Sequence, residues 1–175
     1  MQKNLVLTVI GPDRPGLVES LSRLVGEHGG NWTQSRMAHL AGQFAGILQI
    51  ALPAEAVPGL RAALEASGEL RVLIAEDEGD SVARETGRGL ALKLDLVGQD
   101  RPGIVREISR ILTAHGVNVE KLSTGCESAP WSGETLFRAR ATLQAPPDAD
   151  IDALRTAIEA IAQDLMVDVT LARRV

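Results

Sequence analysis

The chain has 175 residues, a net charge of −5, one cysteine, 45% hydrophobic residues and 2% aromatic residues. The acidic balance argues against binding nucleic acid through a broad basic surface, and a single cysteine excludes an intrachain disulfide. No apolar run is long enough to span a bilayer and residues 1–10 contain no cleavage signal, so we expect a cytoplasmic protein with no membrane contact.

The first part of the chain alternates between extended and helical patterns. Alternating residues over 5–10 predict a strand, which ends at a loop containing proline and glycine. Apolar residues at helical spacing follow over 18–25, and Gly29 lies where a left-handed C-terminal cap is expected. Two extended runs joined by a tight turn come next, then a second helix and a last strand. These later elements are expected at Asn31–Leu40, Gln43–Leu52, Val57–Glu65 and Leu70–Ala75.

The second part of the chain repeats the first. Gly11–Asn31 and Gly98–Asn118 are identical at 11 of 21 positions, 87 residues apart. A repeat of this length is a whole small domain. The offset grows to 94 at the second helix, and most of the extra residues fit in Glu127–Trp131, between the two middle strands. In addition to its first helix, the second copy is expected to contain four strands and a second helix. The strands are expected at Leu92–Val97, Asn118–Cys126, Gly133–Leu143 and Met166–Leu171, and the helix at Ile151–Glu159.

Each copy therefore has the order β-α-β-β-α-β. This order predicts an α+β, ferredoxin-like fold in which two helices cover one face of a four-stranded antiparallel sheet. The polar segment 77–88 is the predicted linker, so the two domains are expected at 1–76 and 89–175.

The sequence Asp-Arg-Pro-Gly lies between the first strand and first helix of each copy. A helix N-terminus offers unpaired N–H groups and the positive end of the helix dipole to a carboxylate. Proline fits the first helical turn, glycine lets a ligand approach closely, aspartate accepts from an ammonium group, and asparagine both donates and accepts. The candidate ligand-binding residues are Asp13, Arg14, Pro15, Gly16, Leu17 and Asn31, with Asp100, Arg101, Pro102, Gly103, Ile104 and Asn118.

A purely structural reading of the same residues stays open. Aspartate often caps or braces a turn, the arginines either stay solvated or bridge to aspartate, and asparagine can simply turn the chain after a helix. His28 and His115 suit the last turn of the first helix. The only other histidine, His39, and the single Cys126 have no companion ligands, so we expect no metal site.

A strand, a Gly-x-Asp-Arg-Pro-Gly-hydrophobic-Val turn, a helix and Gly-x-Asn occur twice, and this arrangement resembles the ACT domain, a small amino-acid-sensing module. The resemblance covers nearly the whole chain. The pattern Asn31-x-x-x-Ser35-Arg36-Met37-Ala38-x-Leu40-x-x-x-Phe44 is also similar to the first ACT unit of the glycine cleavage system transcriptional repressor family. The segment 118–124 resembles the second unit of that family less specifically.

The resemblance implies that the ligand is a small amino acid. Serine-binding ACT sites carry asparagine where Asp13 and Asp100 stand, and histidine where Gly11 and Gly98 stand. These departures favour glycine as the ligand, with serine as the alternative.

The resemblance further implies a protein partner, the LysR-type transcriptional activator of the glycine cleavage operon. Repression would then act through protein contact, with Ser35 and Arg36 as the partner surface, rather than through direct DNA binding. Because edge strands pair readily with another sheet, ACT units usually join side by side, and we expect a homo-oligomer.

Two other functions stay open. A free-standing ACT protein can be a regulatory subunit that controls a metabolic enzyme. Some enzymes of formyl-folate or phosphoserine chemistry begin with a similar ACT unit. Here no residues remain for a catalytic domain, and no set of nucleophile, base and orienting group is visible. We therefore expect no enzyme activity, no catalytic residues and no cofactor.

Overall fold

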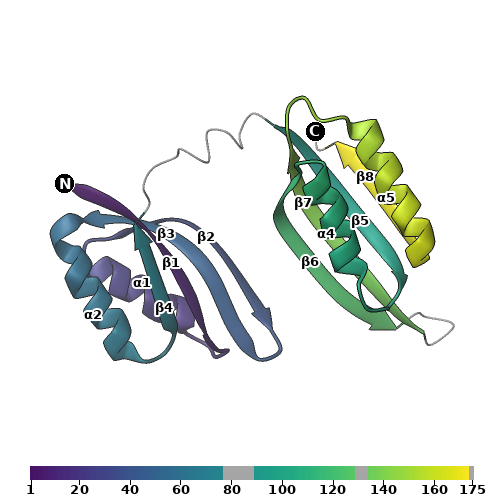
Figure 1. Ribbon diagram of the computed structural model, residues 1–175. Helices are drawn as coiled ribbons and strands as arrows, with labels where there is room; N and C mark the ends of the chain where they lie inside the picture. Colours follow the sequence, from purple (N-terminus) through teal and green to yellow (C-terminus); the bar gives the residue numbers. More distant parts are fainter. Residues whose placement is uncertain (77–88, 129–133, 174–175) are drawn as a thin grey trace. The chain divides into compact units, whose positions relative to one another are not determined.

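The computed structural model describes residues 1–76, 89–128 and 134–173. The chain divides into two compact units, Met1–Asp80 (unit 1) and Ser81–Val175 (unit 2), which are shown in Figure 1. The predicted linker at 77–88 lies outside the described residues, as do Trp131 and Gly133.

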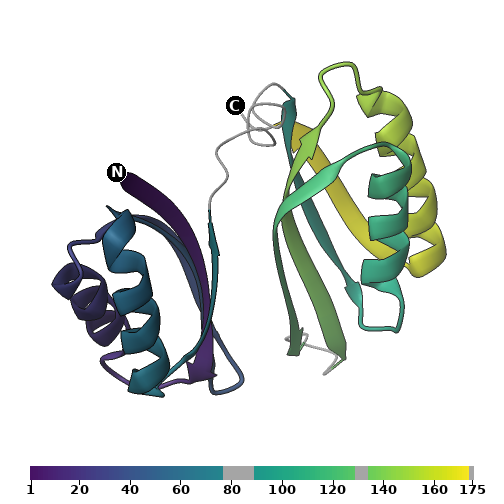
Figure 2. The same cartoon turned by 60° about the vertical axis from the view of Figure 1, so that its left-hand side comes forward.

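Unit 1 has the predicted order of strands and helices, and its sheet is antiparallel throughout, with strand order β2-β3-β1-β4. Both helices cover the same face of this sheet, as Figures 1 and 2 show. A short 3-10 helix, Ala54–Ala56, leads into the second helix. The elements are β1 (Gln2–Pro12), α1 (Leu17–Glu27), β2 (Asn31–Leu40), β3 (Gln43–Pro53), α2 (Val57–Ser67) and β4 (Arg71–Glu76).

Unit 2 repeats this topology with strand order β6-β7-β5-β8, which confirms the predicted α+β fold for both copies. Its elements are β5 (Leu90–Gln99), α4 (Ile104–Ala114), β6 (Asn118–Ser128), β7 (Thr135–Ala145), α5 (Ile151–Leu165) and β8 (Val167–Arg173). Among the described residues, no helix is both long and apolar enough to cross a membrane.

Among the boundaries in unit 2 that differ from the prediction, two lie at the end of α5. Helix α5 continues past Glu159 to Leu165, and Ala162 on this extension is buried like the earlier apolar residues of the helix. Met166, predicted to begin the last strand, is the C-cap of α5 instead. It adopts a left-handed conformation with φ +53, and its N–H donates to the carbonyl of Gln163. The strand therefore begins one residue later.

Each unit has its own hydrophobic core between its sheet and its two helices. The alternation predicted for the first strands places every second residue in this core. The fully or almost fully buried side chains of these strands are Leu5, Leu7 and Val9 in unit 1 and Leu92, Leu94 and Leu96 in unit 2.

The sheet face without helices differs between the two units. In unit 1 it exposes apolar side chains, among them Ile47 at 55% and Leu73 at 75%. In unit 2 the position equivalent to Ile47 is Arg140, whose Nε lies 3.4 Å from a carboxylate oxygen of Asp95. We call the sheet face without helices the open face of each unit. It is apolar in unit 1 and charged in unit 2.

Candidate functional site

Each Asp-Arg-Pro-Gly loop ends at a glycine that is the N-cap of the following helix. Gly16 has φ +93 and Gly103 has φ +98. Their carbonyl oxygens accept the N–H groups of Ser20 and Glu107 at 2.8 and 3.0 Å. Neither helix has a side-chain cap hydrogen bond. The first-turn N–H groups of α1 and α4 are thus left without a side-chain acceptor from their N-caps.

The roles predicted for the loop's proline and glycine need correction. Pro15 and Pro102 precede the N-cap, so they lie outside the first helical turn in which we placed them. A Cβ on Gly16 or Gly103 would meet no described atom within 4 Å. What requires glycine in the chain itself is therefore the left-handed φ, which other L-residues adopt at a cost.

We expect Gly16→Ala to destabilise unit 1 by about 1–2 kcal/mol, the cost of a Cβ in the left-handed region. Gly26→Ala is the matched control. Gly26 lies inside α1 at negative φ with open space around it, so alanine there should stabilise the protein by up to about 1 kcal/mol. Chemical denaturation measures both changes, and equal effects of the two substitutions would contradict this account.

The aspartate of each loop is tied to the sheet through its backbone. The N–H of Asp13 donates to the carbonyl of Gly42 at 2.9 Å, and the N–H of Asp100 donates to the carbonyl of Thr135 at 3.0 Å. The Asp13 carboxylate, 40% exposed, lies 3.5 Å from Nε2 of His39. Because the aspartates do not cap the helices, their carboxylates remain accessible to a cation.

His39 and Cys126 occupy the same place in the two units, which the sequence analysis missed. His39 pairs with Phe44 on β3, and Cys126 pairs with Phe137 on β7. The two residues are 87 positions apart, the spacing of the repeat itself, and this spacing was the available signal. His39 lies beside Asp13, and the Asp100 carboxylate lies close enough to the Cys126 thiol to raise its pKa.

Local desolvation and then the negative charge of Asp100 raise the pKa of the Cys126 thiol. Since the thiolate is the reactive form, we expect Asp100→Asn to lower this pKa and to speed alkylation of Cys126 severalfold at a pH near the ordinary thiol pKa of about 8.5. The rate profile should shift toward lower pH. Asp13→Asn, at the equivalent position of unit 1, is the control and should leave the rate unchanged.

The arginines of the two loops differ. Arg14 lies 2.9 Å from a carboxylate oxygen of Glu69, with 52% of its side chain exposed, so it bridges to glutamate and not to the loop aspartate. Arg101 forms no ion pair within the described residues. Within the described residues, Arg14 is thus the loop arginine that is held by an ion pair.

Gly11 and Gly98 allow close packing of neighbouring backbone. A Cβ on Gly11 would lie 2.9 Å from Cδ2 of Leu70, and one on Gly98 would lie 2.5 Å from Cγ1 of Val167. A histidine, which serine-binding ACT sites carry here, would press on the Leu70 side chain and the Glu69 carbonyl in unit 1 and on the backbone of Val167 in β8 in unit 2. The departure from the serine-type pattern is thus built into the packing of both units.

The asparagines lie far from the loops of their own units. Asn31 is the first residue of β2, a strand of 10 residues. The N–H of Asp13 donates to the carbonyl of Gly42, which lies just beyond the other end of β2. Ten strand residues span roughly 30 Å. In unit 2, Asn118 is likewise the first residue of β6, and Asp100 is hydrogen-bonded to Thr135, beyond the other end of that strand. One small ligand cannot contact the loop and the asparagine of the same unit.

The two residues of the predicted partner surface lie on opposite faces of β2. Ser35 pairs with the buried Leu48 and therefore lies on the helix side, whereas Arg36 pairs with Ile47 on the open face. Only Arg36 thus belongs to the open face.

The histidines in the last turns of α1 and α4 are structural. His28 is the C-cap of α1, and its Nδ1 lies 2.8 Å from the carbonyl oxygen of Leu24; His115 is the C-cap of α4. Within the described residues, no group of three or more histidine, cysteine, aspartate or glutamate side chains is arranged to hold a metal ion.

Comparison with known families agrees with the fold of the two units. Residues 3–75 match one ACT-domain model, and residues 94–159 match a second. The chain is a tandem ACT-domain protein. The tandem ACT-domain protein is 26% identical to the glycine cleavage system transcriptional repressor of Escherichia coli K12, over 94% of the chain and 86% of that protein. The same figures hold for the repressor of Shigella flexneri.

Among solved structures, an unknown protein from Galdieria sulphuraria is similar over 100% of both chains, with a TM-score of 0.88 and 28% identity. Together with the two ACT domains, the similarity to the repressors supports a regulatory role for the tandem ACT-domain protein.

Proposed function

We propose that the protein senses a small amino acid and represses the glycine cleavage system by contacting a transcriptional activator. The observation that carries the proposal is the duplicated loop, in which an exposed aspartate comes three residues before the N-cap of a helix whose first turn has no side-chain cap, in both units. This arrangement suits the two charged ends of an amino acid. The repressors similar to this chain are similar over nearly its whole length.

Glycine is the ligand that we favour. Its carboxylate would accept from the first-turn N–H groups, and its ammonium group would bind the Asp13 or Asp100 carboxylate. Serine is the alternative, although Gly11 and Gly98 stand where serine-type sites carry histidine and pack closely against Leu70 and Val167. Because the loop and the asparagine of one unit are far apart, we propose that a second copy of the chain supplies Asn31 or Asn118 to a loop.

The proposed partner surface is centred on Arg36. This cation lies in the open face of unit 1 beside the exposed Ile47. An apolar surface with an arginine at its side is typical of protein interfaces, in which arginine is enriched and burial of apolar groups supplies affinity. We propose a LysR-type activator as the protein that binds there, in the cytoplasm.

A mobility-shift assay with the glycine cleavage promoter tests this mechanism. With a net charge of −5, the protein alone should leave the DNA fragment unshifted, since binding to phosphates needs clustered cations. It should add a slower band only when the activator is already on the DNA. A sequence-selective shift by the protein alone that resists salt would refute repression through protein contact.

A further inference from the structure

The open face of unit 1 exposes a large apolar side chain on each of its strands. Ile10 of β1, Ile47 of β3 and Leu73 of β4 are 46%, 55% and 75% exposed. The strand register brings them together, because Thr8 pairs with both Ile47 and Leu73, and Ile10 lies two residues further along β1. Leu40 adds an exposed side chain at the end of β2. A contiguous apolar patch of this kind is typical of an interaction site.

The fold does not require an apolar open face, because unit 2 has the same topology without one. Several apolar residues of the open face in unit 1 correspond, through the strand register, to charged residues in unit 2. They are Val6, Leu40, Ala45 and Ile47, which correspond to Lys93, Glu127, Arg138 and Arg140. The apolar surface is therefore specific to unit 1.

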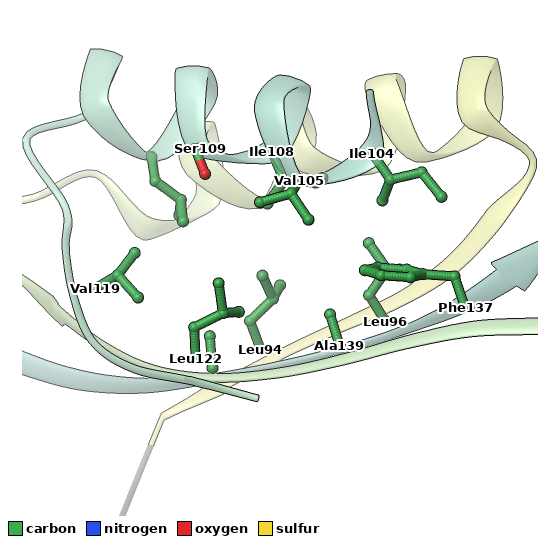
Figure 3. A pocket seen from close by; sticks show the side chains of 12 residues that line it. Leu94, Leu96, Ile104, Val105, Ile108, Ser109, Val119, Leu122, Phe137 and Ala139 are labelled. Carbon is green, nitrogen blue, oxygen red and sulfur yellow. The ribbon is translucent and has the colours of Figure 1, made fainter. Parts of the chain in front are cut away.

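In unit 2, exposed apolar side chains gather on the helix side of the sheet instead. Figure 3 shows Val105 of α4 opposite Val119 and Leu122 of β6, around an apolar cavity of about 30 Å³. These three side chains are 42%, 38% and 50% exposed. Because the two apolar surfaces lie on different faces of their sheets, a variant of one serves as a control for the other.

Two exposed arginines lie at opposite edges of the open face of unit 1. Arg36 is on the edge strand β2, and Arg71 is on the edge strand β4, where it pairs with Ile10. Neither forms an ion pair with another described residue. Glu76 is the one acidic residue in the strands of unit 1, and it pairs with the buried Leu5, on the helix side. The strands of unit 1 thus present two cations and no carboxylate on the open face.

The separation of these arginines matches the width of an α-helix. The strand order β2-β3-β1-β4 places the two edge strands three strand spacings apart, which is roughly 14 Å. An α-helix with its side chains is about 10–12 Å across. A helix that lies along the strands therefore covers the apolar centre of the open face and has one arginine on each side.

A second copy of the chain suits this surface less well. Two such faces packed together would gather both arginines of each copy, with no strand carboxylate on either face to neutralise them. A partner with carboxylates at its sides is complementary to the same surface. The charges therefore favour an acidic partner over self-association.

We propose that the open face of unit 1 binds an amphipathic α-helix of a protein partner, with an apolar stripe and carboxylates on both sides of the stripe. The inference rests on the proposed function, because it names the element by which the proposed partner is recognised. The stripe packs on Ile10, Ile47 and Leu73, and the carboxylates pair with Arg36 and Arg71.

The test is a fluorescence titration of the full chain with two labelled helical peptides of about 18 residues. Both peptides have the same leucine stripe, which is flanked by glutamate in one and by lysine in the other. We expect the glutamate peptide to bind about 10- to 30-fold more tightly at low salt, because attraction replaces repulsion at two arginines. Arg36→Ser and Arg71→Ser should each reduce this preference about 3- to 5-fold.

Ile47→Arg, which introduces the charge that unit 2 carries, should weaken the binding of both peptides by about 10-fold or more, because apolar burial is lost. Leu73→Thr, at a second exposed position of the open face, should act in the same direction. Both side chains are more than half exposed, so the variants should fold, which thermal melts check. Leu122→Ser, in the apolar surface of unit 2, is the matched control and should leave both affinities unchanged.

The inference is overturned if the two peptides bind equally, if neither binds, or if Ile47→Arg leaves binding unchanged. Sedimentation of the protein alone would also overturn it if Ile47→Arg converts a dimer to a monomer, since a second copy would then cover the face. Activator capture that is weakened by Arg36→Ala but not by Arg71→Ala would refute the helix and leave the proposed function standing. Preference for the glutamate peptide without activator capture would support the helix and refute the proposed activator.

Discussion

Asp13→Ala will weaken glycine binding to unit 1 about 10- to 100-fold, and Asp100→Ala will do the same in unit 2. The expected size is that of a lost hydrogen bond to a charged group, about 1.5–3 kcal/mol. Asp13 is partly exposed and does not cap its helix, so the thermal transition should change little. Calorimetric titration with glycine, serine and alanine measures the effect.

Asp152→Ala is the matched control for these variants. The Asp152 side chain is 91% exposed in the first turn of α5, which begins at the end of the unit 2 sheet opposite the loop 100–103, and its loss should leave glycine binding as it was. If the parent protein binds none of the three amino acids at millimolar concentration, the sensing hypothesis fails. The protein would then be a partner-binding module that acts without a ligand.

Arg36→Ala will weaken binding to the activator without weakening glycine binding. Saturating glycine should change the partner affinity of the parent roughly 5- to 150-fold, the range that corresponds to typical allosteric coupling of about 1–3 kcal/mol. Asp13→Ala should remove this influence of glycine while leaving the contact itself. A pull-down with immobilised protein, with and without glycine, measures both effects.

Ser35→Ala separates the two faces of β2. Because Ser35 lies on the helix side, its loss should leave partner binding unchanged. A larger effect at Ser35 than at Arg36 would place the partner on the helix side of β2 and contradict our proposal. Equal partner affinity with and without glycine would refute sensing by coupling, since a ligand that binds two states equally shifts nothing. Capture of a metabolic enzyme instead of the activator would favour a regulatory subunit.

The fold could be predicted from periodicity because the first strand of each unit has one buried face. Leu92, Leu94 and Leu96 alternate with polar residues in the sequence and all lie in the core. The left-handed conformation of Gly29 was also correctly predicted, and this residue has φ +68. Met166 was missed because the left-handed C-cap of a helix is usually a glycine, and a methionine there gives no signal in the sequence.

The face assignments along β2 could not be derived from alternation alone. The register shifts between Trp32 and Gln34, and such a bulge inserts one residue into the strand. Trp32 and Ser35, three positions apart, therefore lie on the same face, and Arg36 lies on the other. The sequence contains no glycine or proline at this point to mark the bulge.

The composition of the candidate site was only partly accessible. The loops were visible as a repeated motif, but the pairing of Asp13 with His39 joins residues from different strands. The distance between Asp13 and Asn31 arises because α1 carries the chain from the loop to the opposite end of the sheet, which pattern matching by itself does not reveal.

The contrast between the two open faces determines how ionic strength should affect complexes of this protein. An interface built on the apolar face of unit 1, around Ile47 and Leu73, should be strengthened by sulfate, which favours burial of apolar surface. An interface built on Arg140 and Asp95 in unit 2 should be weakened by added salt through screening. The direction of the salt effect on any partner thus reveals which of the two sheets it contacts.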